Sequence, residues 1–114
     1  MKYHTLNKNR DFARIYKKGK GIVHPHVVVY IRKSKGPATR VGITASKKTG
    51  NAVRRNRARR VIRHALYEVL PKSVGPYDLV FVARGRTASL KSTQMAQTLR
   101  AILEKEGLLQ KEKP

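Results

Sequence analysis

The sequence contains no cysteine, and only six of its 114 residues are acidic. Without cysteine it can form neither disulfides nor thiolate metal sites, which suits a reducing compartment. Its longest apolar runs, 27–31 and 79–83, have five residues each, against the roughly 18 that a membrane-spanning helix needs. The first residues also lack the apolar segment of a secretory signal. We therefore expect a cytoplasmic protein without a membrane-spanning helix.

The few acidic residues also argue against a catalytic site carried by the protein. Their spacing contains no paired carboxylates of the kind that hold the metal ions of a nuclease. His24 and His26 flank Pro25, but no third ligand lies nearby in the sequence, so they do not predict a metal site. Serine and threonine residues have no recognisable base partner. We expect no catalytic residue and no protein-bound metal.

Basic residues, in contrast, are abundant. Lysine and arginine number 27, which gives a formal charge of +21. Such a charge repels itself and calls for a polyanionic partner, either nucleic acid or an anionic membrane surface. The length and the hydrophobic content of 39% suit one domain with a single core. We expect one domain over residues 1–114, with 108–114 as a frayed tail.

Hydrophobic periodicity and turn residues predict an α+β protein with the order helix, strands, helix, strand, helix. Asn7 or Asn9 can cap the first helix, Gly36 and Pro37 suggest a hairpin turn, and Pro71 stops the second helix. The predicted helices cover residues 7–18, 51–70 and 89 or 92 to 107, and the predicted strands cover residues 27–33, 40–46 and 77–85, the last of them buried and central.

Residues 47–63 hold eight positive charges in seventeen positions and still have the pattern of a helix. Like charges at this spacing repel one another, so a negative partner is expected to complete the segment. Arginine contacts phosphate through a planar fork of donors, and the N–H groups at the start of the helix would face the same anion. The candidate nucleic-acid contacts are Lys47, Lys48, Asn51, Arg54, Arg55, Asn56, Arg57, Arg59, Arg60 and Arg63.

Two other interpretations of this segment are weaker. A cationic face that only confers solubility would normally be interspersed with acids, and this stretch contains none. A membrane-surface helix needs exposed apolar residues, whereas the apolar stripe here is the one that a small core needs. Nucleic acid is the preferred partner.

Aromatic residues suggest a second surface. Phe12 and Tyr16 are four residues apart on the first helix, and Tyr30 and Arg32 alternate on a strand, so each pair shares one side of its element. Aromatic rings beside arginine can stack unpaired bases. Spacing alone leaves open whether Phe12 and Tyr16 line such a cleft or belong to the core.

The segment 46–63 closely resembles the signature of the bacterial ribonuclease P protein family. The resemblance extends along most of the chain and is carried further by Asp11-Phe12, Tyr16, Tyr30, Arg40-Val41-Gly42 and Ala83-Arg84. It implies a two-layer α+β sandwich with a mixed sheet of about four strands, in the order αβββαβα. It also implies a left-handed crossover through the basic helix, against the usual right hand, and a likeness to a domain found in a ribosomal protein.

The resemblance further implies the protein partner of a catalytic RNA that cleaves precursor tRNA to leave the mature 5′ end. The RNA would supply the active site and hold most of the Mg²⁺, and no obligate protein partner is implied. The cleft that takes the single-stranded 5′ leader would be formed by Phe12, Tyr16, Tyr30, Arg32 and Ser46. A ribosomal protein that coats folded RNA and a nonspecific DNA-compacting protein remain the alternatives.

Overall fold

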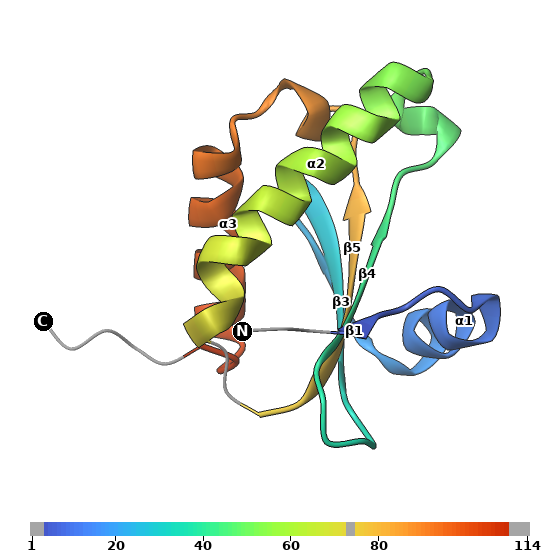
Figure 1. Cartoon of the computed structure of the whole chain (residues 1–114), viewed down its shortest axis with the longest axis vertical. Coiled ribbons are helices and arrows are strands. Elements are labelled where there is room, and N and C mark those ends of the chain that lie inside the picture. The colour runs from blue at the N-terminus through green and yellow to red at the C-terminus, as the bar shows by residue number, and fades with distance from the viewer. Residues whose placement is uncertain (1–3, 73–74, 110–114) are drawn as a thin grey trace, which may run out of the picture.

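The computed structural model describes residues 4–72 and 75–109, and these form a mixed five-stranded sheet with helices on both faces (Figure 1). Helices α2 and α3 cover one face, and α1 lies against the other. The elements in chain order are β1 (His4–Thr5), α1 (Asn9–Lys18), β2 (Lys20–Val23), β3 (Val27–Lys33), β4 (Arg40–Thr44), η1 (Lys47–Thr49), α2 (Ala52–Val69), η2 (Leu70–Lys72), β5 (Tyr77–Ala83), η3 (Thr87–Ser89) and α3 (Ser92–Lys105). The predicted α+β class with three helices is confirmed, but the sheet has five strands rather than about four.

The predicted hairpin between residues 27–33 and 40–46 is wrong. The strand order is β1-β4-β5-β3-β2, so β5 lies between β3 and β4, antiparallel to the first and parallel to the second. Strand β5 buries Leu79, Val80 and Phe81 almost completely, as is typical of a central strand with both faces covered. The loop between β3 and β4 crosses the end of β5 instead of making a tight turn.

Strand β5 is central, as the sequence predicts, and α2 connects it to its parallel neighbour β4. The left hand that the resemblance implies for this crossover stays a prediction. The order αβββαβα that the resemblance implies is confirmed, with β1 as an additional strand before it. Strands β1 and β2, which hydrophobic periodicity does not predict, form the edges of the sheet. Both are short and mostly exposed, so no apolar alternation reveals them in the sequence.

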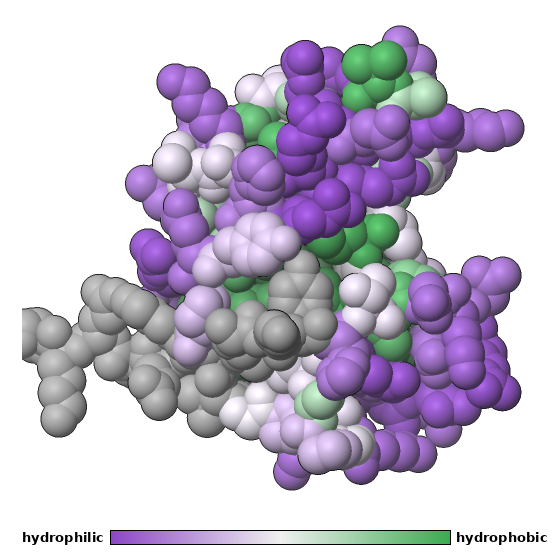
Figure 2. All heavy atoms as spheres, viewed as in Figure 1, coloured by the Kyte–Doolittle hydropathy of each residue, from purple (hydrophilic) through white to green (hydrophobic). Residues whose placement is uncertain are grey.

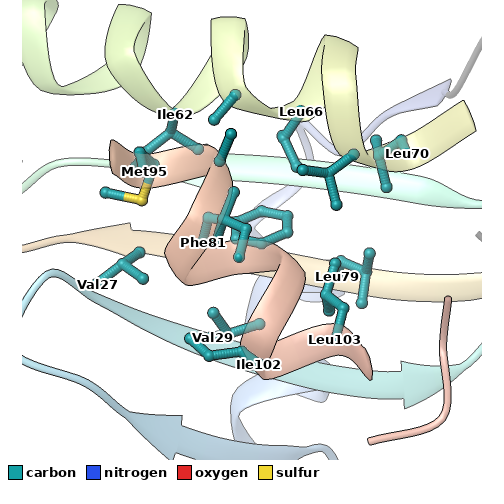
Figure 3. Packing of buried hydrophobic residues seen from close by; sticks show 14 of the residues in the cluster. Val27, Val29, Ile62, Leu66, Leu70, Leu79, Phe81, Met95, Ile102 and Leu103 are labelled. Carbon is teal, nitrogen blue, oxygen red and sulfur yellow. The ribbon is translucent and has the colours of Figure 1, made fainter. Parts of the chain in front are cut away.

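The main core lies between the sheet and the pair of helices α2 and α3 (Figure 3). Ile62, Leu66 and Leu70 come from α2 and the turn that follows it, and they meet Phe81 and Leu79 of β5. Helix α3 adds Met95, Leu99, Ile102 and Leu103 to the same cluster. The apolar stripe of the basic helix is therefore used for packing, as predicted.

The start of α1 and the tail after α3 differ from the expectations, whereas Gly107 ends the last helix as predicted. Lys8, and neither asparagine, is the N-cap of α1, and its side chain makes no capping hydrogen bond. Beyond α3, Gly107 adopts φ of 79°, and the Leu108 N–H donates to the Leu103 carbonyl over 2.8 Å. Leu108 and Leu109 are buried in the main core, so a frayed tail cannot begin at residue 108; residues 110–114 lie outside the described residues.

Within residues 4–72 and 75–109, no helix combines the length and the apolar character needed to cross a membrane.

Candidate nucleic-acid interface

The start of the basic helix is built by a short turn, η1, and two polar side chains. The Ser46 hydroxyl accepts a hydrogen bond from the Lys48 N–H (3.3 Å), and the Asn51 side-chain oxygen accepts one from the Arg54 N–H (2.9 Å). The N–H groups of Thr49 and Gly50 donate to the carbonyls of Ser46 and Lys47. The expectation of free N–H groups facing an anion is therefore wrong for these four donors, because each is used within the turn or the cap.

Arg54 differs from the other arginines because its side chain folds back onto the protein. Its guanidinium donates to the carbonyls of Thr49 (3.2 Å) and Gly85 (2.6 Å) and to the Ser89 hydroxyl (3.3 Å). A Cβ at Gly50, whose φ is 135°, would lie 2.8 Å from the Arg54 Cδ. Arg54 therefore ties η1 to the chain that follows β5, and its donors are largely used inside the protein.

The outer face of α2 is cationic and uncompensated. Asn56, Arg57, Arg60 and Arg63 are exposed, whereas Arg55 and Arg59 are half-buried at the flanks, as helical projection predicts. Arg59 donates to the Asn56 side-chain oxygen over 3.0 Å. The salt bridges found among residues 4–72 and 75–109 join Lys20 to Glu106 and Arg40 to Asp11 and Asp78, so α2 takes part in none of them. Hydrophilic side chains cover the visible side of this helix (Figure 2).

An aromatic residue on the same face escaped the sequence analysis. Tyr67 is 64% exposed and follows Asn56, Arg60 and Arg63 along one stripe of the helix, at spacings of four, three and four residues. Its position outside the apolar stripe of the helix, on the face that carries the arginines, is the sequence signal that could have revealed it.

The aromatic residues of the second candidate surface come together on the opposite face of the sheet. The rings of Tyr16 and Tyr30 meet edge to face with centroids 4.8 Å apart, and those of Phe12 and Tyr16 are 6.4 Å apart. Phe12 and Tyr30 are half-buried against a small cluster of Leu6, Ile15 and Val80, while Tyr16 is 41% exposed. Core and cleft are thus not alternatives here, since Phe12 belongs partly to the small core and Tyr16 forms its exposed border.

Gly42 allows Phe12 to approach the sheet. A Cβ at residue 42 would lie 2.5 Å from the Phe12 Cε1, closer than any side chain could tolerate. The glycine pairs in register with Val80, which in turn pairs with Tyr30. The Phe12 ring therefore lies directly over Gly42 of β4, in the same row of the sheet as Val80 and Tyr30.

Part of this face of the sheet stays open beyond α1. The next row of the sheet toward η1 consists of Val28, Val82 and Thr44, all half-buried, and Figure 2 shows the outline of the molecule hollowed between α1 and η1. We call the hollow over this row, bordered by Phe12, Tyr16 and Tyr30, the α1 cleft. Its floor residues were missed by the sequence analysis, although the period-two alternation of β3 and β5 assigns Val28 and Val82 to the same face as Tyr30.

The structure does not bring Arg32 and Ser46 together. Ser46 follows β4 at the η1 end of the α1 cleft, whereas Arg32 lies one row beyond Tyr30 in the opposite direction, level with Asp78 and Arg40. Each row is displaced by two residues, which is about 7 Å along a strand. Of the five residues predicted to form one cleft, Phe12, Tyr16 and Tyr30 therefore border the α1 cleft and Ser46 lies at its η1 end, whereas Arg32 lies one row outside it.

The carboxylates near this face are already paired. The Arg40 guanidinium donates to both oxygens of the buried Asp78 over 2.9 and 2.8 Å, and it lies 3.8 Å from Asp11. The hydrogen-bonded Asp78 raises the pKa of Arg40, which therefore stays charged. In the described part of the chain, no three histidine or acidic side chains gather closely enough to hold a metal ion.

A cationic helix face on one side of an α+β sheet and an aromatic cleft on the other are features typical of nucleic-acid-binding domains. The family model described as ribonuclease P matches residues 1–107. The chain therefore belongs to the ribonuclease P protein family, whose members are accessory subunits of a tRNA 5′-processing endoribonuclease.

Individual relatives agree with this assignment. The ribonuclease P protein component of Clostridioides difficile (strain 630) is 45% identical over 80 residues, covering 69% of this chain and 70% of the relative. That of Oceanobacillus iheyensis is 34% identical over 109 residues, covering 95% and 90%.

Solved structures show the same fold. The Staphylococcus aureus ribonuclease P protein superposes with a TM-score of 0.81 at 33% identity, covering 96% of this chain and all of that chain. The Thermotoga maritima protein gives 0.77 at 26% identity, covering 90% and 96%.

Proposed function

We propose that this protein binds the catalytic RNA of ribonuclease P through α2 and the preceding turn, and the 5′ leader of precursor tRNA through the α1 cleft. The observation that carries the proposal is the uncompensated cationic face of α2, where exposed arginines lie beside no acidic partner among the described residues. A phosphate backbone supplies the missing charge.

The arginines of α2 divide between two roles. Arg57, Arg60 and Arg63 reach outward and are free to contact RNA phosphates, with Tyr67 offering a ring for an unpaired base. Arg54 and Asn51 shape the turn that presents Lys47 and Lys48. Arg55, Asn56 and Arg59 complete the face, and η1 lies between this face and the α1 cleft.

The α1 cleft is suited to a single strand rather than a duplex. Tyr16 and Tyr30 present ring edges and faces beside an apolar floor, which stacks bases with little regard for their identity. Ser46, at the η1 end of the cleft, supplies a polar contact to the backbone of the RNA, and Arg32 lies one row beyond Tyr30, where the RNA leaves the cleft.

The same proposal accounts for the chemistry and the location. Catalysis belongs to the RNA, whose phosphates hold the Mg²⁺ ions of the holoenzyme, and the protein acts by binding and positioning. Residues 1–114 function as one domain in the cytoplasm, where precursor tRNA is processed, without a membrane or an obligate protein partner.

Two variants test the assignment of the two surfaces. We expect Arg57→Ala to weaken binding of the catalytic RNA, and Tyr30→Ala to weaken binding of precursor tRNA to the holoenzyme by about tenfold without changing the affinity for mature tRNA. Tyr30→Phe, which keeps the ring, is the matched control and should bind nearly as the parent does. Equal weakening of mature and precursor tRNA by Tyr30→Ala would overturn the leader assignment.

A further inference from the structure

A second basic site lies at the end of the sheet that is far from η1, on the face that α1 covers. It is a cavity of about 380 Å³ between α1, the end of β3 and the loop that joins β3 to β4. Its cationic lining comes from Arg14, Arg32, Lys35 and Arg40, and His4 of β1 adds a further ring. Among the described residues, Asp78 is the one carboxylate that lines it. We call this cavity the distal pocket.

The charges of the distal pocket are unequally satisfied. Both nearby carboxylates interact with Arg40. Asp78 accepts two hydrogen bonds from its guanidinium, and Asp11 lies 3.8 Å from it. Among the residues that the structure describes, no acid lies within salt-bridge distance of Arg14 or Arg32. Two arginines on different elements therefore converge on one cavity with their charge uncompensated, a donor arrangement that fits a phosphate group.

The wall opposite α1 is a loop with a defined internal structure. The Ser34 hydroxyl donates to the Ala38 carbonyl over 3.2 Å and accepts a hydrogen bond from the Gly36 N–H over 3.2 Å. These two bonds close the segment 34–38 into a compact turn and place Lys35 on the rim of the distal pocket. The pocket thus has a built boundary and is not only a set of dispersed surface charges.

The distal pocket continues the α1 cleft in one direction. Tyr30 and Arg32 lie on the same face of β3, about 7 Å apart along the strand. From η1 the rows of this face run in the order Thr44, Val82 and Val28, then Gly42, Val80 and Tyr30, and finally Arg40, Asp78 and Arg32. A single-stranded RNA that enters the cleft beside η1 therefore meets the aromatic rings first and the distal pocket afterwards.

We propose that the distal pocket binds phosphodiester groups of single-stranded RNA, upstream of the nucleotides that stack in the α1 cleft. The inference rests on the proposed binding of the leader in that cleft and extends its path past Tyr30. Arg14 and Arg32 contact the phosphates, and Arg40, held by Asp78, maintains the shape of the pocket without contributing a free charge.

The test uses the holoenzyme reconstituted with a bacterial ribonuclease P RNA, and precursor tRNAs whose leaders are lengthened one nucleotide at a time. Arg14→Gln and Arg32→Gln should each lower the affinity about threefold to tenfold, but only for leaders long enough to pass Tyr30. The slope of log affinity against log salt should also fall by about 0.7 for each phosphate that the variant no longer neutralises. Lys105→Gln, which removes one charge from the end of α3, is the matched control and should change neither quantity.

The order of the two effects separates this proposal from the proposed function. Tyr30→Ala should reduce affinity from a shorter leader length onward than Arg14→Gln and Arg32→Gln do. If Tyr30→Ala shows its leader-dependent decrease in affinity while the two arginine variants match Lys105→Gln, the distal pocket is not on the RNA path and the inference is overturned alone. If leader length has no influence on the parent protein, both proposals fail.

A second measurement distinguishes RNA from a free anion. The Arg14 and Arg32 side-chain N–H signals of the free protein can be followed by NMR during titration with inorganic phosphate and with a single-stranded oligoribonucleotide. We expect the oligoribonucleotide to shift both signals at much lower concentration. A response to inorganic phosphate without a response to the oligoribonucleotide would contradict the proposal.

Discussion

Arg54 and Arg57 are neighbours on α2 with identical side chains and different surroundings. The guanidinium of Arg54 bonds to three groups of the protein, and two of them lie 31 and 35 residues away in the sequence. Arg57 is exposed and forms no salt bridge with any described residue. One arginine therefore stabilises the fold, and the other is available to a ligand.

Substitution should separate these two roles. Arg54→Ala removes hydrogen bonds between η1 and the chain after β5, so we expect the free energy of unfolding to fall by about 1 kcal/mol, limited by the exposure of the side chain. Arg57→Ala should change it by less than about 0.5 kcal/mol. Urea unfolding of both variants measures the difference, and equal midpoints would show that the hydrogen bonds of Arg54 contribute nothing to stability.

At the scale of elements, periodicity in the sequence predicts α2, β5 and α3 within a few residues, because each has a long apolar face that determines its type. The pairing between strands, in contrast, could not be predicted from the sequence. The hairpin prediction fails because local turn residues do not reveal that β5, encoded more than thirty residues later, inserts between β3 and β4. The hydrogen bonds of Arg54 to Gly85 and Ser89 could not be predicted for the same reason, because these partners are distant in the sequence.

The connection between β2 and β3 contains a hydrogen bond that depends on pH. The Nδ1 atom of His24 accepts from the His26 N–H over 3.0 Å, which requires that nitrogen to be unprotonated. Desolvation, and secondarily the charge of His26, lower the pKa of His24. The unfolded chain binds this proton more tightly than the folded protein does, so the contribution of His24 to stability is present above about pH 6.5 and is lost as the pH falls below it.

We expect the urea midpoint of the parent protein to decrease more between pH 7.5 and about pH 5 than that of His24→Asn. Asparagine can accept a hydrogen bond from the N–H two residues later but does not titrate, so it is the appropriate substitution. Parallel pH profiles for the two proteins would exclude His24 as a source of the pH dependence.

At the scale of the whole molecule, the charge of +21 opposes folding in the absence of anions. Two basic regions, the outer face of α2 and the distal pocket, concentrate this charge on surfaces with few acids. Composition alone predicts a polyanionic partner. The division into two regions could not be predicted, because Arg14, Arg32 and Lys35 come together only through the packing of α1 on the sheet.

Multivalent anions should therefore stabilise the free protein. We expect the thermal unfolding midpoint to rise in sulfate or phosphate relative to chloride at the same ionic strength, because the folded state binds these anions and the unfolded chain does so weakly. Unfolding followed by circular dichroism measures the effect. Identical midpoints in all three salts would contradict anion-linked folding.

The most direct test of the central claim is single-turnover cleavage of precursor tRNA by a bacterial ribonuclease P RNA at limiting Mg²⁺, with and without this protein. The proposed function predicts faster cleavage with the protein, and a larger stimulation for a long leader than for a leader of one nucleotide. The absence of stimulation with an RNA that is active at high Mg²⁺ would contradict the proposed function.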